Sequence, residues 1–205
     1  GGATGIEVAG ILSEMKKFVL PNDYPDMSSS LMHIYLIEAG PRLLAGMSEE
    51  SSAHAEQFLR EMGVNILLNK RVVDYRDHKV VLEDGTEIAT RTFIWVSGVT
   101  GVTIGNLDAS LIGRGGRIKV DSFNRVEGMN NVFAIGDQCI QLADENYPNG
   151  HPQLAQVAIQ QGELLAKNLI RMEKGQEMKP FHYRNLGSMA TVGRNRAVAE
   201  FSKVN

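Results

Sequence analysis

The stretch GGATGIEVAG, residues 1–10, decides the fold class of this chain. Gly2 and Gly5 have the spacing of the second and third glycines in the motif G-x-G-x-x-G, which joins a strand to a helix in dinucleotide-binding domains. The second glycine lets a pyrophosphate approach the backbone, and the third lets the helix pack closely on the strand. Half of the motif is also compatible with an ordinary glycine-rich loop, so the rest of the chain has to support it.

The hydrophobic pattern of the first half of the chain predicts alternating helices and strands. In chain order we expect a helix at 4–19, a strand at 32–40, a helix at 49–62 capped by Ser48, a strand at 64–69, an antiparallel meander at 71–98 and, at its end, an apolar strand at 93–98. This is the order of a βαβαβ nucleotide-binding half with a β-meander, lacking only its first strand. The sequence therefore predicts an α/β, Rossmann-like fold.

The second half of the chain follows a glycine-rich stretch at 97–105, which is typical of a hinge between domains. Its expected elements are strands at 116–121 and 131–137, a helix at 154–172 and a hairpin at 187–201 that turns around Gly193.

Glu38 supports the dinucleotide interpretation of the first glycines. It follows the apolar run of the second strand, where an acidic side chain can accept hydrogen bonds from the adenosine ribose and disfavours a 2′-phosphate. This indicates NADH rather than NADPH, although Arg42 could soften the preference. The usual gap after the motif is about 20 residues, so the longer distance to Glu38 requires the loop at 21–30 to be an insertion. A surface acid at a strand end is the alternative.

Composition argues against several other classes of function. The net charge is −3, which disfavours a nucleic-acid-binding face. Cys139 is the single cysteine and can form neither an internal disulfide nor a C-x-x-C pair. The five histidines are scattered without the spacing of a metal site, and no apolar run approaches the ~18 residues of a membrane span.

Six stretches, taken together and in this order, resemble the type II NADH dehydrogenases, which are single-subunit NADH:quinone oxidoreductases. They are TGIEVAG, YLIEAGPRLL, IWVSGV, NVFAIGD, HPQLAQVAIQQG and GSMATVGRNRAV. The resemblance covers essentially the whole chain, and its last two stretches are the most specific. It implies a flavoprotein in which an NAD-binding domain is inserted into an FAD-binding domain, with a C-terminal region that seats the enzyme on a membrane.

On this template the chain is an internal fragment, truncated at both ends. Residues 1–97 correspond to the NAD-binding domain without its first strand, 98–182 to the C-terminal half of the FAD-binding domain, and 183–205 to the start of the C-terminal region. The resemblance implies that Asp137, with Gly136 beside it, holds the ribitol of FAD. Gly98, at the small-residue exit of the strand at 93–98, is the remaining candidate for cofactor contact. For Gly136 and Asp137, the alternative is a Gly-Asp turn that binds no ligand.

Three residues are candidates for the quinone side. Gln156 and Gln160 are four apart on one face of the expected helix, and side-chain amides there could bond to a quinone carbonyl or to the flavin edge. They match the family motif A-Q-x-A-x-Q-Q, which includes Gln161; a solvated helix face is the alternative. Glu7 has two interpretations: it could close a capping box with Thr4, or, as the resemblance implies, act near the flavin and quinone.

We therefore expect the intact protein to use NADH, FAD and a quinone, on the cytoplasmic side of a membrane as a peripheral protein. Two alternatives remain open: a soluble NADH-dependent flavoprotein reductase with another acceptor, and a non-catalytic nucleotide-binding redox sensor. The absence of C-x-x-C counts against a disulfide reductase. The fragment alone is expected to be soluble and inactive, to hold FAD weakly, and to be capable of forming a homodimer through unpaired strand edges.

Overall fold

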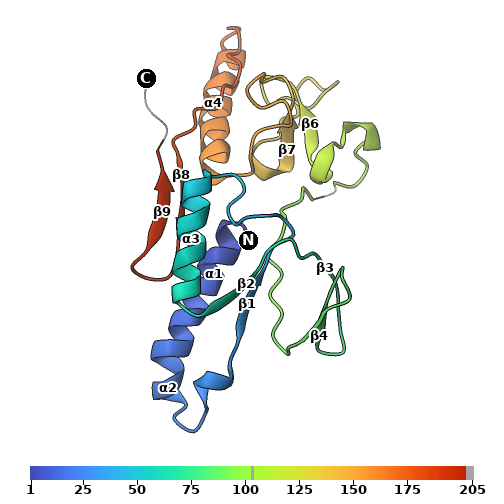
Figure 1. Cartoon of the computed structure of the whole chain (residues 1–205). Helices are drawn as coiled ribbons and strands as arrows, with labels where there is room; N and C mark the ends of the chain where they lie inside the picture. The colour runs from blue at the N-terminus through green and yellow to red at the C-terminus, as the bar shows by residue number, and fades with distance from the viewer. Residues whose placement is uncertain (103, 202–205) are drawn as a thin grey trace. The chain divides into compact units, whose positions relative to one another are not determined.

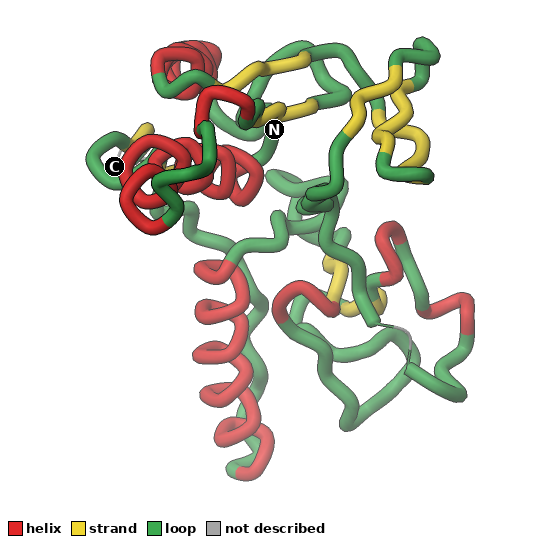
Figure 2. Tube along the Cα trace, turned by 90° about the horizontal axis from the view of Figure 1, so that it is seen from below, coloured by secondary structure: helices red, strands yellow, loops and turns green. Residues whose placement is uncertain are grey.

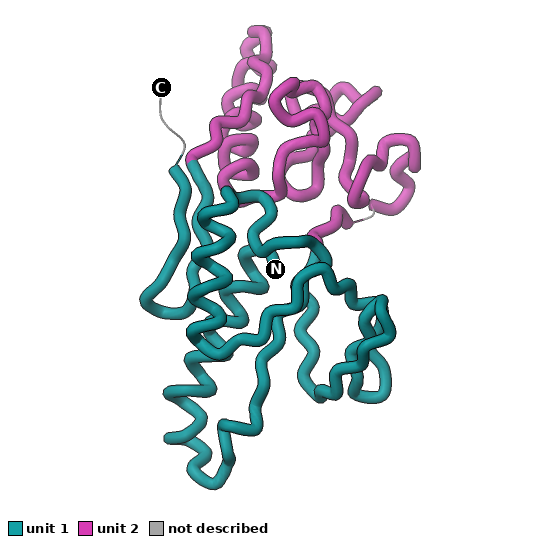
Figure 3. The backbone as a smooth tube through the Cα atoms, viewed as in Figure 1, with its two compact units in different colours: residues 1–97, 187–205 teal, residues 98–186 magenta. Residues whose placement is uncertain are grey.

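The computed structural model describes residues 1–102 and 104–201. Residues 103 and 202–205 lie outside the described residues, and the latter end the segment at 183–205 that we expected to begin a C-terminal region. The chain forms two compact units (Figure 3), one of residues 1–97 and 187–205 and the other of 98–186. The assignment of these parts to NAD-binding and FAD-binding domains stays a prediction.

The first unit is built around two parallel strands, β1 (Ile34–Ile37) and β2 (Val64–Leu67), with Ile34 opposite Val64. Helix α1 (Ala3–Glu14) packs on β1, and α3 (Glu49–Glu61) packs on β2. Ser48 caps α3 by accepting a hydrogen bond of 3.1 Å from the Ser51 amide. The predicted strand–helix–strand order is therefore confirmed.

A third layer covers the two helices (Figure 1). The hairpin of β8 (Ser188–Thr191) and β9 (Ala197–Glu200) packs on α1 and α3, on their side away from β1 and β2. Contact is close at Gly10 of α1, where a β-carbon would lie only 2.5 Å from the Gly193 nitrogen. The apolar side chains of all three layers form one buried core that includes Ile6, Leu59 and Ala190.

The first helix differs from the prediction of a single helix at 4–19. Regular α-helix ends at Glu14, and the chain continues as a π-helical turn over Met15–Val19 and a short helix α2 over Leu20–Asp23. Pro21 lies in the first turn of α2, where it lacks the amide that a continuing helix would need. A 3₁₀ turn at Ser29–Leu31 then leads to β1.

The meander is confirmed, but the strand predicted at 93–98 is wrong. Strands β3 (Val72–Arg76), β4 (Lys79–Leu82) and β5 (Glu87–Ala89) form an antiparallel sheet in that order. Among the described residues no strand pairs with 93–98, and Trp95 is 61% exposed. A strand exists only through hydrogen bonds to a neighbour, so an apolar run without one stays irregular.

The second unit contains two short parallel strands, β6 (Ile118–Val120) and β7 (Cys139–Gln141), and the long helix α4 (Ala155–Glu173). The strand predicted at 131–137 is wrong, since only Phe133 forms a bridge, with Arg125. The parallel partner of β6 comes later because the chain first turns through a 3₁₀ helix at Gly136–Gln138. Further 3₁₀ turns lie at Ala109–Leu111 and Arg114–Gly116. Figure 2 shows the loops and turns of the chain in green between its helices and strands.

Candidate cofactor and substrate sites

Gly2 and Gly5 occupy the positions that the glycine motif requires. Gly2 is the N-cap of α1, with extended backbone, and a β-carbon there would have no neighbour within 4 Å. Gly5 is buried, and a β-carbon on it would lie 3.4 Å from Leu36 of β1 and 3.5 Å from Val96. The first amides of a helix have no partner within it, and the helix dipole is positive at this end. The open end of α1 therefore has the properties of a phosphate-binding site.

Glu38 lies directly after β1, beside this helix end. Its carboxylate accepts a hydrogen bond of 2.7 Å from the Gly40 amide, and a β-carbon on Gly1 would lie 2.5 Å from its Oε2. Partial burial by itself would raise the pKa of Glu38, and the hydrogen bond from the Gly40 amide acts in the opposite direction and lowers it. The structure thus places a carboxylate beside the glycine turn.

Glu7 does not form the capping box that its spacing with Thr4 allows. The N-cap of α1 is Gly2, without a side-chain cap, so Thr4 is already inside the helix. Glu7 instead faces the hairpin and accepts weak hydrogen bonds of 3.4 and 3.3 Å from the amide and hydroxyl of Thr191. The capping interpretation is therefore wrong, and the quinone-side interpretation stays a prediction.

Gly136 and Asp137 form the tight turn that the flavin interpretation requires. Gly136 has a positive φ of 64°, and a β-carbon there would lie 3.2 Å from the Ala158 β-carbon. Asp137 is exposed, and its backbone carbonyl accepts a hydrogen bond of 3.1 Å from Gln153. Gly98 also has a positive φ, of 83°, with open space around its α-carbon.

Gln156 and Gln160 lie on one face of α4, as predicted, and both bond to the backbone of a following extended segment, residues 184–186. The Gln160 amide both donates to the Arg184 carbonyl, at 2.9 Å, and accepts from the Arg184 amide, at 3.0 Å. Gln156 accepts from the Leu186 amide at 3.1 Å. The two glutamines hold this segment along the helix, which neither of the original interpretations included.

A buried pair of a histidine and a carboxylate in the second unit was not predicted from the sequence. His151 is 2% exposed, and its Nε2 lies 3.0 Å from the carboxylate of Asp144. The hydrogen bond from His151 lowers the pKa of Asp144. Arg117 donates to the carbonyls of His151, at 3.0 Å, and Cys139, at 2.6 Å. This group braces the chain just after the Gly136 turn. Asp144 and His151 are seven residues apart, but Arg117 precedes His151 by 34 residues, so the one signal in the sequence was a histidine shortly before a helix.

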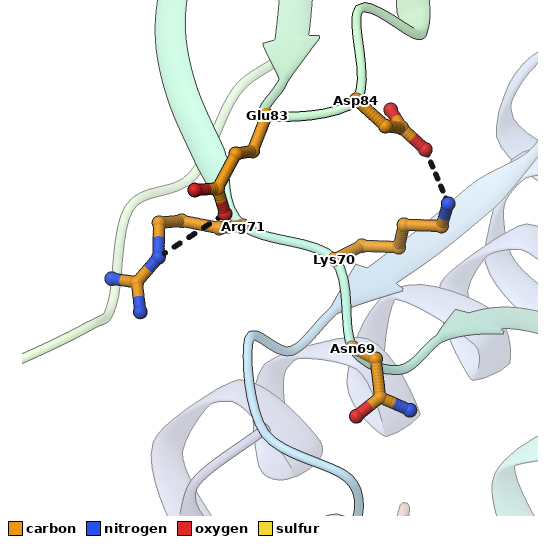
Figure 4. Close-up of a pocket in the computed structure, with 5 residues that line it drawn as sticks. All are labelled: Asn69, Lys70, Arg71, Glu83 and Asp84. Carbon is orange, nitrogen blue, oxygen red and sulfur yellow. Dashed lines mark hydrogen bonds and ion pairs between the residues drawn. The ribbon is translucent and has the colours of Figure 1, made fainter.

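Neither of two cavities in the first unit contains a predicted site residue. One, of about 170 Å³, is lined by Asn69, Lys70, Arg71, Glu83 and Asp84 (Figure 4). Its charges already pair with each other, Lys70 with Asp84 and Arg71 with Glu83. The other, of about 380 Å³, lies between α1, the end of α3 and the hairpin turn.

The described residues contain no group of His, Cys, Asp or Glu that could hold a metal ion. Within that same part of the chain, no helix is long and apolar enough to cross a membrane.

Residues 1–162 match the family described as pyridine nucleotide-disulphide oxidoreductase. The chain belongs to this family. Its α/β, FAD/NAD(P)-binding, Rossmann-like fold is thereby confirmed.

Individual relatives of this family member agree with the resemblance seen in the sequence. The type II NADH:quinone oxidoreductase NdhA of Mycobacterium tuberculosis is 33% identical over 99% of this chain, and that of Haemophilus influenzae is 30% identical over 98%. These alignments cover 44% and 45% of the relatives, so the chain spans less than half of their length. NDH2 of Plasmodium falciparum, solved in complex with NADH, superposes with a TM-score of 0.83 at 18% identity, over 98% of this chain and 56% of that one.

Proposed function

We propose that this chain is part of an NADH:quinone oxidoreductase that passes a hydride from NADH to FAD and two electrons from the flavin to a quinone. The observation that carries the proposal is the position of the Glu38 carboxylate beside the open end of α1, where a β-carbon on Gly1 would lie 2.5 Å from Oε2. An anion-binding helix end and a ribose-binding acid are the two halves of a dinucleotide site. Relatives named as NADH:quinone oxidoreductases support the choice of reaction.

The NADH side would use Gly2, Gly5 and Glu38. The pyrophosphate would bind at the N-terminus of α1, where Gly2 leaves the backbone accessible. Glu38 would accept hydrogen bonds from the adenosine ribose and repel the extra phosphate of NADPH. The hydrogen bond from the Gly40 amide supports this role, because it favours the ionised carboxylate, and only that form repels a phosphate.

The FAD side would use Gly136, Asp137 and Gly98. The glycine turn supports this role, since its positive φ brings the backbone close to α4 and leaves the Asp137 side chain exposed. Asp137 would bind the ribitol hydroxyls. Bound flavin supplies the ability to accept a hydride and to release two electrons, while the protein binds and orients it.

The quinone side would use Gln156 and Gln160, with Glu7 as a further carboxylate. Each glutamine is now bonded to the backbone of 184–186. A quinone carbonyl would therefore replace one of these hydrogen bonds. In balance, NADH, one proton and the quinone yield NAD⁺ and the quinol, and a carboxylate such as Glu7 could deliver the proton.

The location and assembly of the intact protein are proposals on the same basis. We place it on the cytoplasmic face of a membrane, as a peripheral protein that reaches its quinone through a C-terminal region, and expect it to be capable of forming a homodimer.

The test is an assay of the full-length gene product that carries this sequence. NADH oxidation should be coupled to reduction of a short-chain quinone, in the presence of bound FAD. Flavin reduction without quinone turnover would instead support the soluble reductase with another acceptor. NADH binding without any turnover would support the redox sensor.

A further inference from the structure

Gln161 is a fully buried polar side chain beside the Gly136 turn, and the proposed function does not use it. Only 1% of the residue is exposed, although it lies in the middle of α4. Its Oε1 accepts a hydrogen bond of 2.7 Å from the backbone amide of Gly136. A buried amide that lost this acceptor would be left unsatisfied, so the bond constrains where the turn can lie.

The same helix face holds the turn from a second side. Ala158 is one helical turn before Gln161, and its β-carbon would lie 3.2 Å from any β-carbon on Gly136. The thiol of Cys139, at the far end of the turn, donates to the same Gln161 oxygen at 3.7 Å. Burial raises the pKa of this thiol, which keeps the proton that the contact needs. One glutamine oxygen therefore joins both ends of the turn that presents Asp137.

Gln161 and Gln160 are neighbours in the sequence but serve different parts of the structure. Consecutive residues of a helix do not face the same way. Gln160 faces the extended segment and bonds to Arg184, whereas Gln161 faces the core and bonds to Gly136. Both glutamines belong to the same family motif, but they bind different parts of the chain.

We propose that Gln161 is a positioning residue for the flavin side: it holds the Gly136 amide and thereby aims Asp137 at the cofactor, with no contact to the quinone. This inference rests on the proposed function, because it takes Asp137 as a ligand of FAD. It also assigns Gln161 to the flavin side, where NADH reduces FAD, and Gln160 to the quinone side, where the flavin reduces the quinone.

The experiment compares three variants of the full-length protein, Gln161→Met, Gln161→Glu and Gln160→Met. Methionine has a similar length but no oxygen acceptor, while glutamate retains one. We expect Gln161→Met to weaken FAD binding about tenfold, measured by flavin absorbance after dialysis against stepped FAD concentrations. Gln161→Glu should recover most of this affinity. Gln160→Met should keep FAD affinity and instead raise the KM for a short-chain quinone.

Circular dichroism and thermal unfolding of each apoprotein serve as the folding control. If Gln161→Met fails to fold, the comparison of Gln161→Glu with Gln161→Asn decides, since only glutamate places an oxygen at the original reach. Equal FAD affinity in Gln161→Met and the parent, or equal loss in Gln161→Met and Gln161→Glu, would overturn the inference. Failure of the parent protein itself to bind FAD or to reduce quinone would overturn the proposed function instead.

Discussion

Two glycine turns, one in each unit, carry the nucleotide chemistry proposed for this chain, and they are built in opposite ways. The turn at Gly2 is open, and a side chain there would meet nothing within 4 Å. The turn at Gly136 is held from one side by Ala158 and from another by the oxygen of Gln161. The first is shaped by the end of its own helix. The second is shaped by a helix that follows later in the chain, so its conformation depends on tertiary packing.

The largest expected effect comes from filling the held turn. Gly136→Ala should lower the free energy of unfolding by about 2–4 kcal/mol, because an alanine there has a left-handed backbone and overlaps Ala158. The matched control is Gly128→Ala, where φ is also positive, at 74°, but the surroundings are open. Chemical denaturation measures both. Equal losses at the two glycines would show that Ala158 does not constrain the turn.

The next effect tests the acid beside the open turn. Glu38→Gln should raise the KM for NADH about tenfold or more, because hydrogen bonds to a charged acceptor contribute about 1.5–3 kcal/mol. It should also narrow the preference for NADH over NADPH. Steady-state kinetics with both nucleotides measure this, with the exposed Glu50→Gln as control. An unchanged ratio between the nucleotides would contradict the role given to Glu38.

A third prediction concerns the pH dependence of the brace behind the held turn. The hydrogen bond from His151 lowers the pKa of Asp144 in the folded protein. Its contribution to stability is therefore fully present above the unfolded pKa of about 3.9 and is lost as the pH falls through the lower folded value. Asp144→Asn should reduce stability at neutral pH by about 1–3 kcal/mol and flatten this part of the acid-unfolding curve.

Urea unfolding at a series of pH values measures this dependence, with the exposed Asp26→Asn as control. The same acid sensitivity in Asp144→Asn as in the parent would show that the pair with His151 does not supply it.

The smallest effect on stability is expected at the open turn itself. Gly2→Ala should change the free energy of unfolding by less than about 1 kcal/mol, since its backbone, with φ −74° and ψ 178°, suits alanine and its surroundings are empty. NADH binding should nevertheless weaken, because the methyl group would meet the pyrophosphate. Calorimetric unfolding and NADH titration separate the two effects. A loss of stability as large as that of Gly136→Ala would remove the contrast between the turns.

Particular residues show which features of the structure could be predicted from the residues next to them in the sequence. The N-cap Ser48 and the end of α3 before Gly63 were predictable, because capping and helix termination depend on a few adjacent residues. The irregular backbone at 93–98 was not predictable, because the apolar composition of this run says nothing about whether a neighbouring strand exists. Glu7 has the spacing of a capping box with Thr4, yet the helix begins earlier and the hairpin supplies Thr191 as its partner.

The sequence by itself determined the order of helices and strands in the first unit, the helix that carries Gln156 and Gln160, and the family to which the chain belongs. These depend on periodicity and on short motifs, which are local. Only the tertiary structure decided which oxygen holds Gly136, which carboxylate pairs with His151, and which backbone the two glutamines bind. The bonds of the glutamines join residues more than 20 apart, and even Asp144 and His151, seven apart, share no regular element. Such contacts form only when packing brings donor and acceptor within hydrogen-bonding distance.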